Sequence, residues 1–149
     1  MTNILLGTVM MVLTTGVHSV FTVFTFFMLR RWVHHRHDMH PYIPLALISG
    51  TILVFFAASL VEVGMWAAAY LVLGALEGLE PSLYYSMVTF TTLGYGDIVL
   101  PDRWRLLASF EAANGIIMFG WTTAIVMAVA QKTFATLLEQ RQRNKESSA

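Results

Sequence analysis

The residues best suited to chemistry lie in one short segment, Thr91-Thr92-Leu93-Gly94-Tyr95-Gly96-Asp97. Glycine adopts left-handed backbone angles without a steric penalty, so Gly94 and Gly96 allow the chain to alternate between ordinary and left-handed conformations. This alternation aims successive backbone carbonyls at one axis. A row of backbone carbonyls is a set of acceptor oxygens, so the chemistry suggested here belongs to the peptide backbone and not to the side chains.

The composition indicates where such a segment would lie. Hydrophobic residues make up 56% of the 149 residues and charged residues 12%, which is below the quarter or so that is typical of a soluble domain. The apolar residues form three runs: 4–29 without a charge, 43–76 with only Glu62, and 106–130 with only Glu111. Each run exceeds the roughly 20 residues that a helix needs to cross a bilayer. We therefore predict an all-α membrane protein with three transmembrane helices.

A fourth helical segment is too short to cross. Residues 82–91 are apolar and aromatic, and as a helix they would span roughly 15 Å, half of the hydrocarbon thickness. The glycine segment follows at once, which predicts a re-entrant loop that returns to the side it entered from. Non-helical backbone at membrane depth has to be buried in protein or line a watery cavity. One copy cannot enclose such a cavity, so we expect several subunits around an axis.

Basic residues predict the orientation, because the cytoplasmic flanks of membrane helices are rich in lysine and arginine. They cluster after the first helix and in the tail, at Arg30, Arg31, Arg36, Lys132, Arg141, Arg143 and Lys145. This places the amino terminus outside the cell and the carboxyl terminus in the cytoplasm. The expected divisions are a first helix over 1–30, a cytoplasmic loop over 31–42, a channel-like unit over 43–131 and a tail over 132–149.

The glycine segment resembles the Thr-Thr-Val-Gly-Tyr-Gly-Asp signature of potassium channels. The resemblance implies an ion filter over Thr92, Leu93, Gly94, Tyr95 and Gly96, and its mechanism is taken over from that family. The carbonyls of the first four residues and the Thr92 hydroxyl would coordinate K⁺. Leu93 departs from the family's valine, so the filter loses a β-branched side chain; we expect selectivity to survive.

The resemblance continues on both sides of the filter. It implies that Tyr84 and Tyr85 form an aromatic cuff that supports the filter together with Asp97, and that the carboxyl end of the half-helix favours a cation. Residues 115–120 are similar to the Gly-Ile-x-x-Phe-Gly of bacterial two-helix potassium channels. The implied hinge and the residues expected to line the conduction path are Gly115, Ile116, Phe119, Thr123 and Met127.

Taken together, these features predict a homotetrameric potassium channel subunit in the cell membrane, surrounded by lipid. Transport would be passive, with K⁺ in the filter, no organic cofactor, no enzymatic activity and no nucleic-acid partner. Two alternatives remain open at this stage. One is a cation channel of weak selectivity, which Leu93 makes conceivable, and the other is an accessory membrane subunit that does not conduct.

The remaining ionisable residues have simpler interpretations. Carboxylates within a membrane are costly and therefore candidates for function. We expect Glu111 to support the half-helix, and the sequence does not decide a role for Glu62. His18 is expected to hydrogen-bond inside the bundle. Four more histidines, His34, His35, His37 and His40, form a basic loop for which solvation is favoured over metal binding or pH sensing.

Overall fold

The computed structural model describes residues 1–34 and 42–146, and these residues are mostly helical and form no strand. The elements in chain order are α1 (Thr2–His34), α2 (Ile43–Val72), α3 (Leu79–Phe90), the short 3-10 helix η1 (Asp102–Trp104) and α4 (Arg105–Glu146). Three helices, α1, α2 and α4, are long and apolar enough to span a membrane. The predicted fold class is therefore confirmed.

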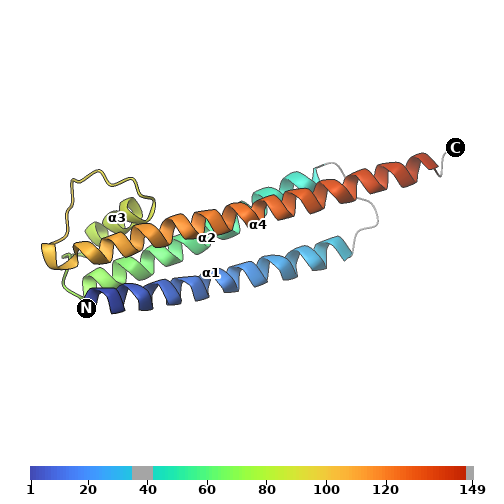
Figure 1. Ribbon diagram of the computed structural model, residues 1–149. Helices are drawn as coiled ribbons and strands as arrows, with labels where there is room; N and C mark the ends of the chain where they lie inside the picture. The colour runs from blue at the N-terminus through green and yellow to red at the C-terminus, as the bar shows by residue number, and fades with distance from the viewer. Residues whose placement is uncertain (35–41, 147–149) are drawn as a thin grey trace.

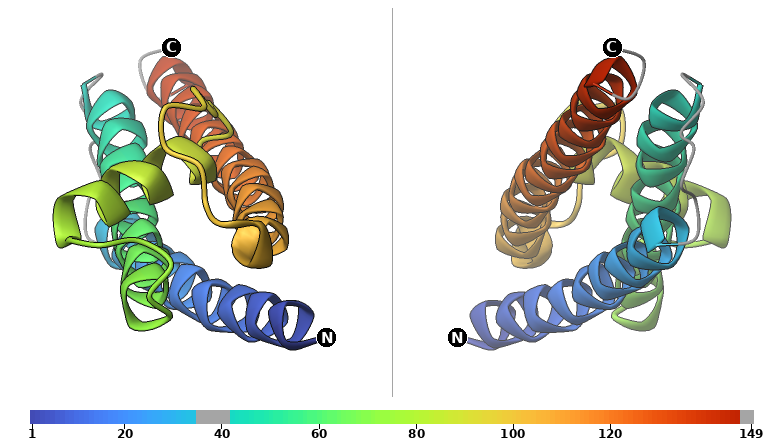
Figure 2. Two further views of the ribbon diagram at one scale, coloured as in Figure 1. Left: turned by 90° about the vertical axis from the view of Figure 1, so that its left-hand side faces the viewer. Right: turned by 90° about the vertical axis from the view of Figure 1, so that its right-hand side faces the viewer.

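The three long helices lie lengthwise beside one another, and α3 packs at one end of them (Figure 1). That end also holds the amino terminus and the start of α4, whereas the carboxyl terminus lies at the opposite end (Figure 1). The helix α1 lies on the far side of the α2 and α4 pair from α3 (Figures 1 and 2). This places an extra helix against a unit made of α2, α3 and α4.

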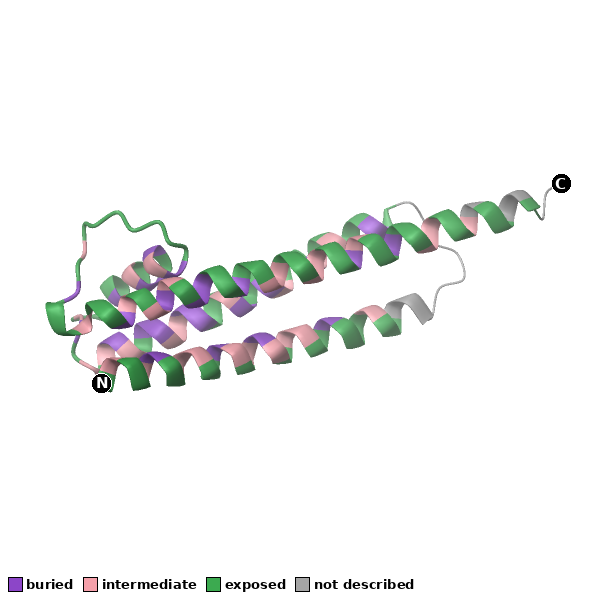
Figure 3. Cartoon of the chain, viewed as in Figure 1, coloured by how far each residue is buried: buried purple, intermediate pink, exposed green. Residues whose placement is uncertain are grey.

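The core forms where α2, α3 and α4 meet. Its largest side chains are Trp66 and Tyr70 of α2, Phe90 of α3, and Leu107 and Met118 of α4, all buried. Elsewhere the long helices expose apolar side chains along most of their length (Figure 3). An apolar surface of this extent is suited to lipid and not to water.

The helix ends differ from the expected ones in two places. First, α3 begins at Leu79, three residues before the expected start, because Gly78 at φ 92° turns the chain and Pro81 is compatible with a first helical turn. Second, α1 continues past Arg30 to His34. The helix α4 runs through the tail to Glu146, because no glycine or proline follows Gly120 to interrupt it. The predicted loop histidines His35, His37 and His40 lie outside the described residues.

Candidate functional site

The site is built on a half-length helix and the loop that follows it. At about 1.5 Å per residue, the 12 residues of α3 span about 18 Å, too short for a bilayer core of about 30 Å. From Phe90 the chain returns as an extended loop to the end of the molecule where η1 and α4 begin (Figure 1). A helix that goes in and a loop that comes back out make a re-entrant segment.

Along the loop, the backbone alternates between left-handed and ordinary angles, as is required for successive carbonyls to point to one side. The angle φ is positive at Thr92 (59°), at Gly94 (55°) and at Gly96 (78°), and among the described residues no other position from 79 to 146 has this conformation. Left-handed angles at every second residue turn successive peptide planes alternately, which directs their carbonyls to one side. The sequence indicated Gly94 and Gly96 for this role. It gave no sign of Thr92, because a β-branched residue rarely adopts positive φ.

The loop residues lie open in the single chain. All seven from Thr91 to Asp97 are exposed (Figure 3), including the large side chains of Leu93 (53%) and Tyr95 (68%). Exposed apolar and aromatic side chains of this size are suited to being covered by lipid or by further protein.

Tyr84 and Tyr85, the two tyrosines of the expected cuff, make contacts with different parts of the chain. The Tyr84 hydroxyl donates to Oδ2 of Asp97 at 2.7 Å, which joins α3 to the end of the loop. This hydrogen bond lowers the pKa of Asp97, so the carboxyl group keeps its negative charge at the loop mouth. Tyr85 instead meets Tyr70 of α2 edge to face, with ring centroids 5.3 Å apart. A hollow of about 190 Å³ lies between α3 and the loop, bordered by both tyrosines and by Gly94 and Gly96.

Glu111 is fully buried behind α3 and joins three helices. Its Oε1 accepts a hydrogen bond from the Ser86 hydroxyl of α3 at 2.5 Å, and its Oε2 accepts one from the Tyr70 hydroxyl of α2 at 2.6 Å. The Ser86 hydroxyl also lies 2.9 Å from the carbonyl of Val63. Glu111 therefore supports α3 from behind, one turn before the loop.

Gly115 lies directly against the end of α3. A β-carbon built at this position would lie 1.9 Å from the carbonyl oxygen of Phe90, the last residue of α3. A β-carbon cannot lie that close to an oxygen atom, so any residue other than glycine would push α4 away. Gly115 therefore allows α4 to approach the base of the loop. One turn further along α4, the Phe119 ring meets the Phe90 ring edge to face at 5.7 Å. The resemblance suggested a hinge at Gly115, and the packing adds a steric reason for glycine there.

The residues expected to line a conduction path share one open face of α4. Ile116 (61% exposed), Phe119, Thr123 and Met127 (58%) are all exposed. Their spacing of 3, 4 and 4 residues places them on one side of the helix. Apart from the contact of Phe119 with the Phe90 ring, this strip lies open along α4.

Several polar contacts were not foreseen from the sequence. Tyr70 and Ser86 bond Glu111, His18 bonds Glu62, and Thr14 bonds Asn114. A signal was present in each case, since a polar residue within a predicted membrane helix needs an internal partner. The pairing itself depends on which helices adjoin. Among the described residues, no group of three histidine or acidic side chains is arranged to hold a metal ion.

The fold and the site define a class of protein: a helical membrane protein with a re-entrant loop. Comparison with known families then gives a match to the ion channel family over residues 45–132, more than half of the chain. This protein belongs to that family. The matched region runs from the start of α2 through α3 and the loop into α4, and leaves α1 outside. Comparisons with curated proteins and with solved structures give no significant match.

Proposed function

We propose that four copies of this chain surround one path that conducts K⁺ passively across the membrane. The observation that carries the proposal is the left-handed backbone at Thr92, Gly94 and Gly96 within a segment that resembles the potassium channel filter. In the proposed path, K⁺ exchanges its water for carbonyl oxygens of residues 92–95 and for the Thr92 hydroxyl. The exposed strip of α4 continues the path below the filter.

Two further features support a path shared between copies. The exposed faces of Leu93 and Tyr95 give neighbouring loops an area to cover. The partial negative charge at the carboxyl end of α3 faces the base of the loop, where it stabilises a cation that has lost its water. In the proposed orientation the loop faces the outside of the cell, with the ionised Asp97 at its entrance, and the carboxyl terminus lies in the cytoplasm.

Flux through reconstituted protein tests the proposal. Purified protein in liposomes should show a barium-sensitive K⁺ flux, and Gly94→Ala should abolish it, because φ is 55° at Gly94 and a β-carbon strains that conformation. Gly50→Ala is the matched control. Gly50 lies in α2 with ordinary backbone angles and open space for a methyl group. Full flux through Gly94→Ala would refute the proposal.

The two rival functions give different results in the same vesicles. A weakly selective cation channel, favoured by leucine in place of valine at position 93, would show a reversal potential close to zero with K⁺ on one side and Na⁺ on the other. An accessory subunit would pass no flux at all. We expect a reversal potential close to that of a K⁺ electrode. In Leu93→Val it should lie closer still to the value for perfect K⁺ selectivity.

A further inference from the structure

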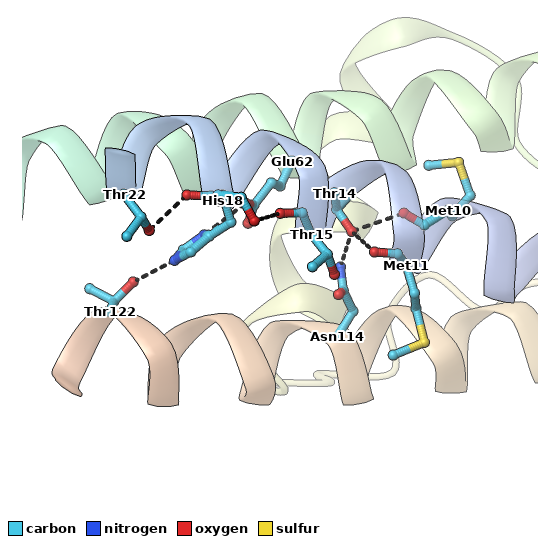
Figure 4. A network of polar contacts seen from close by, with 10 residues as sticks. Met10, Met11, Thr14, Thr15, His18, Thr22, Glu62, Asn114 and Thr122 are labelled. Carbon is cyan, nitrogen blue, oxygen red and sulfur yellow. Dashed lines mark hydrogen bonds and ion pairs between the residues drawn. The ribbon is translucent and has the colours of Figure 1, made fainter. Parts of the chain in front are cut away.

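The helix α1 contacts α4 on both sides of Gly115. Before it, Gly7 lies against the Phe110 ring, since a β-carbon there would come within 2.5 Å of the ring. The Asn114 amide nitrogen donates to the Thr14 hydroxyl at 2.9 Å (Figure 4). Beyond Gly115, the hydroxyl of Thr122 lies 3.3 Å from Nε2 of His18 (Figure 4). The two helices run in the same direction through these contacts.

The same stretch of α1 is fixed to α2. Nδ1 of His18 lies 2.8 Å from Oε1 of Glu62, and both side chains are fully buried. The imidazole ring also contacts the rings of Phe55 of α2 and Trp121 of α4, with ring centroids at 5.1 and 5.3 Å. Because α2 holds His18 from one side, a displacement of α4 cannot simply carry α1 along with it.

We propose that α1 is a brace that restrains bending of α4 at Gly115. Glycine has no β-carbon and accepts a wider range of backbone angles than other residues, so a helix bends more readily there, and α4 is unbroken through Gly115. A bend there moves Thr122 relative to Asn114. Since α1 is itself continuous and bonds both residues, a bend has to break or stretch one of the two hydrogen bonds. The brace therefore favours straight α4.

The bonds of the brace can rearrange. In the part of the chain that the structure describes, Oδ1 of Asn114 and Oε2 of Glu62 are buried without a hydrogen-bond partner. A buried oxygen without a partner is unfavourable, so both remain ready to accept a donor when the helices shift. A network of this kind stabilises one arrangement of α1 against α4 and still permits a second one.

Hydrogen exchange of the α4 backbone tests the brace without reference to conduction. Bending at Gly115 opens the bonds of amides 116–119 to carbonyls one turn earlier. In Thr14→Val and in Thr122→Val these amides should exchange about fivefold faster, the factor that one net hydrogen bond contributes. Thr8→Val and Thr136→Val are the controls, because the hydroxyls of Thr8 and Thr136 bond carbonyls of their own helices. Unchanged exchange in both test variants, or equal acceleration in the controls, would overturn the brace.

The consequence for transport rests on the proposed function and is measured separately. In single-channel recordings, Thr14→Val and Thr122→Val should change the open probability about fivefold in the same direction, with the reversal potential unchanged. Faster exchange with an unaltered open probability would overturn the regulatory role of the brace. Absence of current in the unmutated protein would instead refute the proposed function, and the exchange result would still decide the brace.

Discussion

Two faces of α4 hold buried polar contacts, and they are built differently. On the face toward α2 and α3, both oxygens of Glu111 accept short hydrogen bonds, and Gly115 is in direct contact with the Phe90 carbonyl. On the face toward α1, Asn114 uses only its nitrogen and Thr122 reaches His18 at 3.3 Å. In the first set, both oxygens of Glu111 are paired and the hydrogen bonds are 2.5 and 2.6 Å long. In the second set, one oxygen of Asn114 has no partner and the distances are 2.9 and 3.3 Å.

The difference assigns distinct tasks to the two contact surfaces. Fully paired buried polar groups fix one arrangement, whereas partly paired groups tolerate another. The helix α4 is therefore joined firmly to the segment that carries the filter and loosely to α1. Movement is expected between α4 and α1 before it occurs between α4 and α3.

The strongest challenge to this comparison is Glu111→Ala. It leaves the Tyr70 hydroxyl without its acceptor, leaves the Ser86 hydroxyl with only the Val63 carbonyl, and opens a cavity, so the free energy of unfolding should fall by about 3 kcal/mol or more. Tyr70→Phe removes one of the two donors and should cost about 1 kcal/mol. Reversible unfolding in mixed detergent micelles measures both. A loss below 1 kcal/mol for Glu111→Ala would show that the contact with α3 is not firm.

Substitution of two glycines in the same helix sharpens the comparison. Gly115→Ala forces α4 away from Phe90 and should lower the free energy of unfolding by about 2 kcal/mol, as overpacking does. Gly120→Ala meets nothing within 4 Å and should be neutral or slightly stabilising, because alanine is the better helix former. If the two variants behave alike, the close approach of α4 to α3 does not matter for stability.

The smallest effect is expected at the second buried carboxylate. Glu62→Gln keeps an oxygen within hydrogen-bonding distance of Nδ1 of His18 and replaces Oε2, which has no partner to lose, by an amide nitrogen. The free energy of unfolding should therefore change by about 1 kcal/mol or less. The same micelle assay applies. A loss as large as that of Glu111→Ala would mean that α1 is held as firmly as α3.

The sequence predicted the features that depend on local pattern. Apolar runs predicted the three spanning helices, and glycine spacing predicted left-handed backbone at Gly94 and Gly96, as the structure has it. Positive φ at Thr92 was missed, because the flanking loop geometry overrides the preference of threonine. The partners of Glu111, Glu62 and His18 also could not be assigned, since the order of helices along a chain does not determine which faces meet.

The length of α4 gives the restraint at Gly115 a mechanical meaning. The 31 residues from 116 to the helix end at Glu146 form a rigid arm of about 46 Å at 1.5 Å per residue. A tilt of about 10° at Gly115 would swing its tip through about 8 Å on this geometry. A weak pull on the far end of such a lever would act on the brace with a large torque.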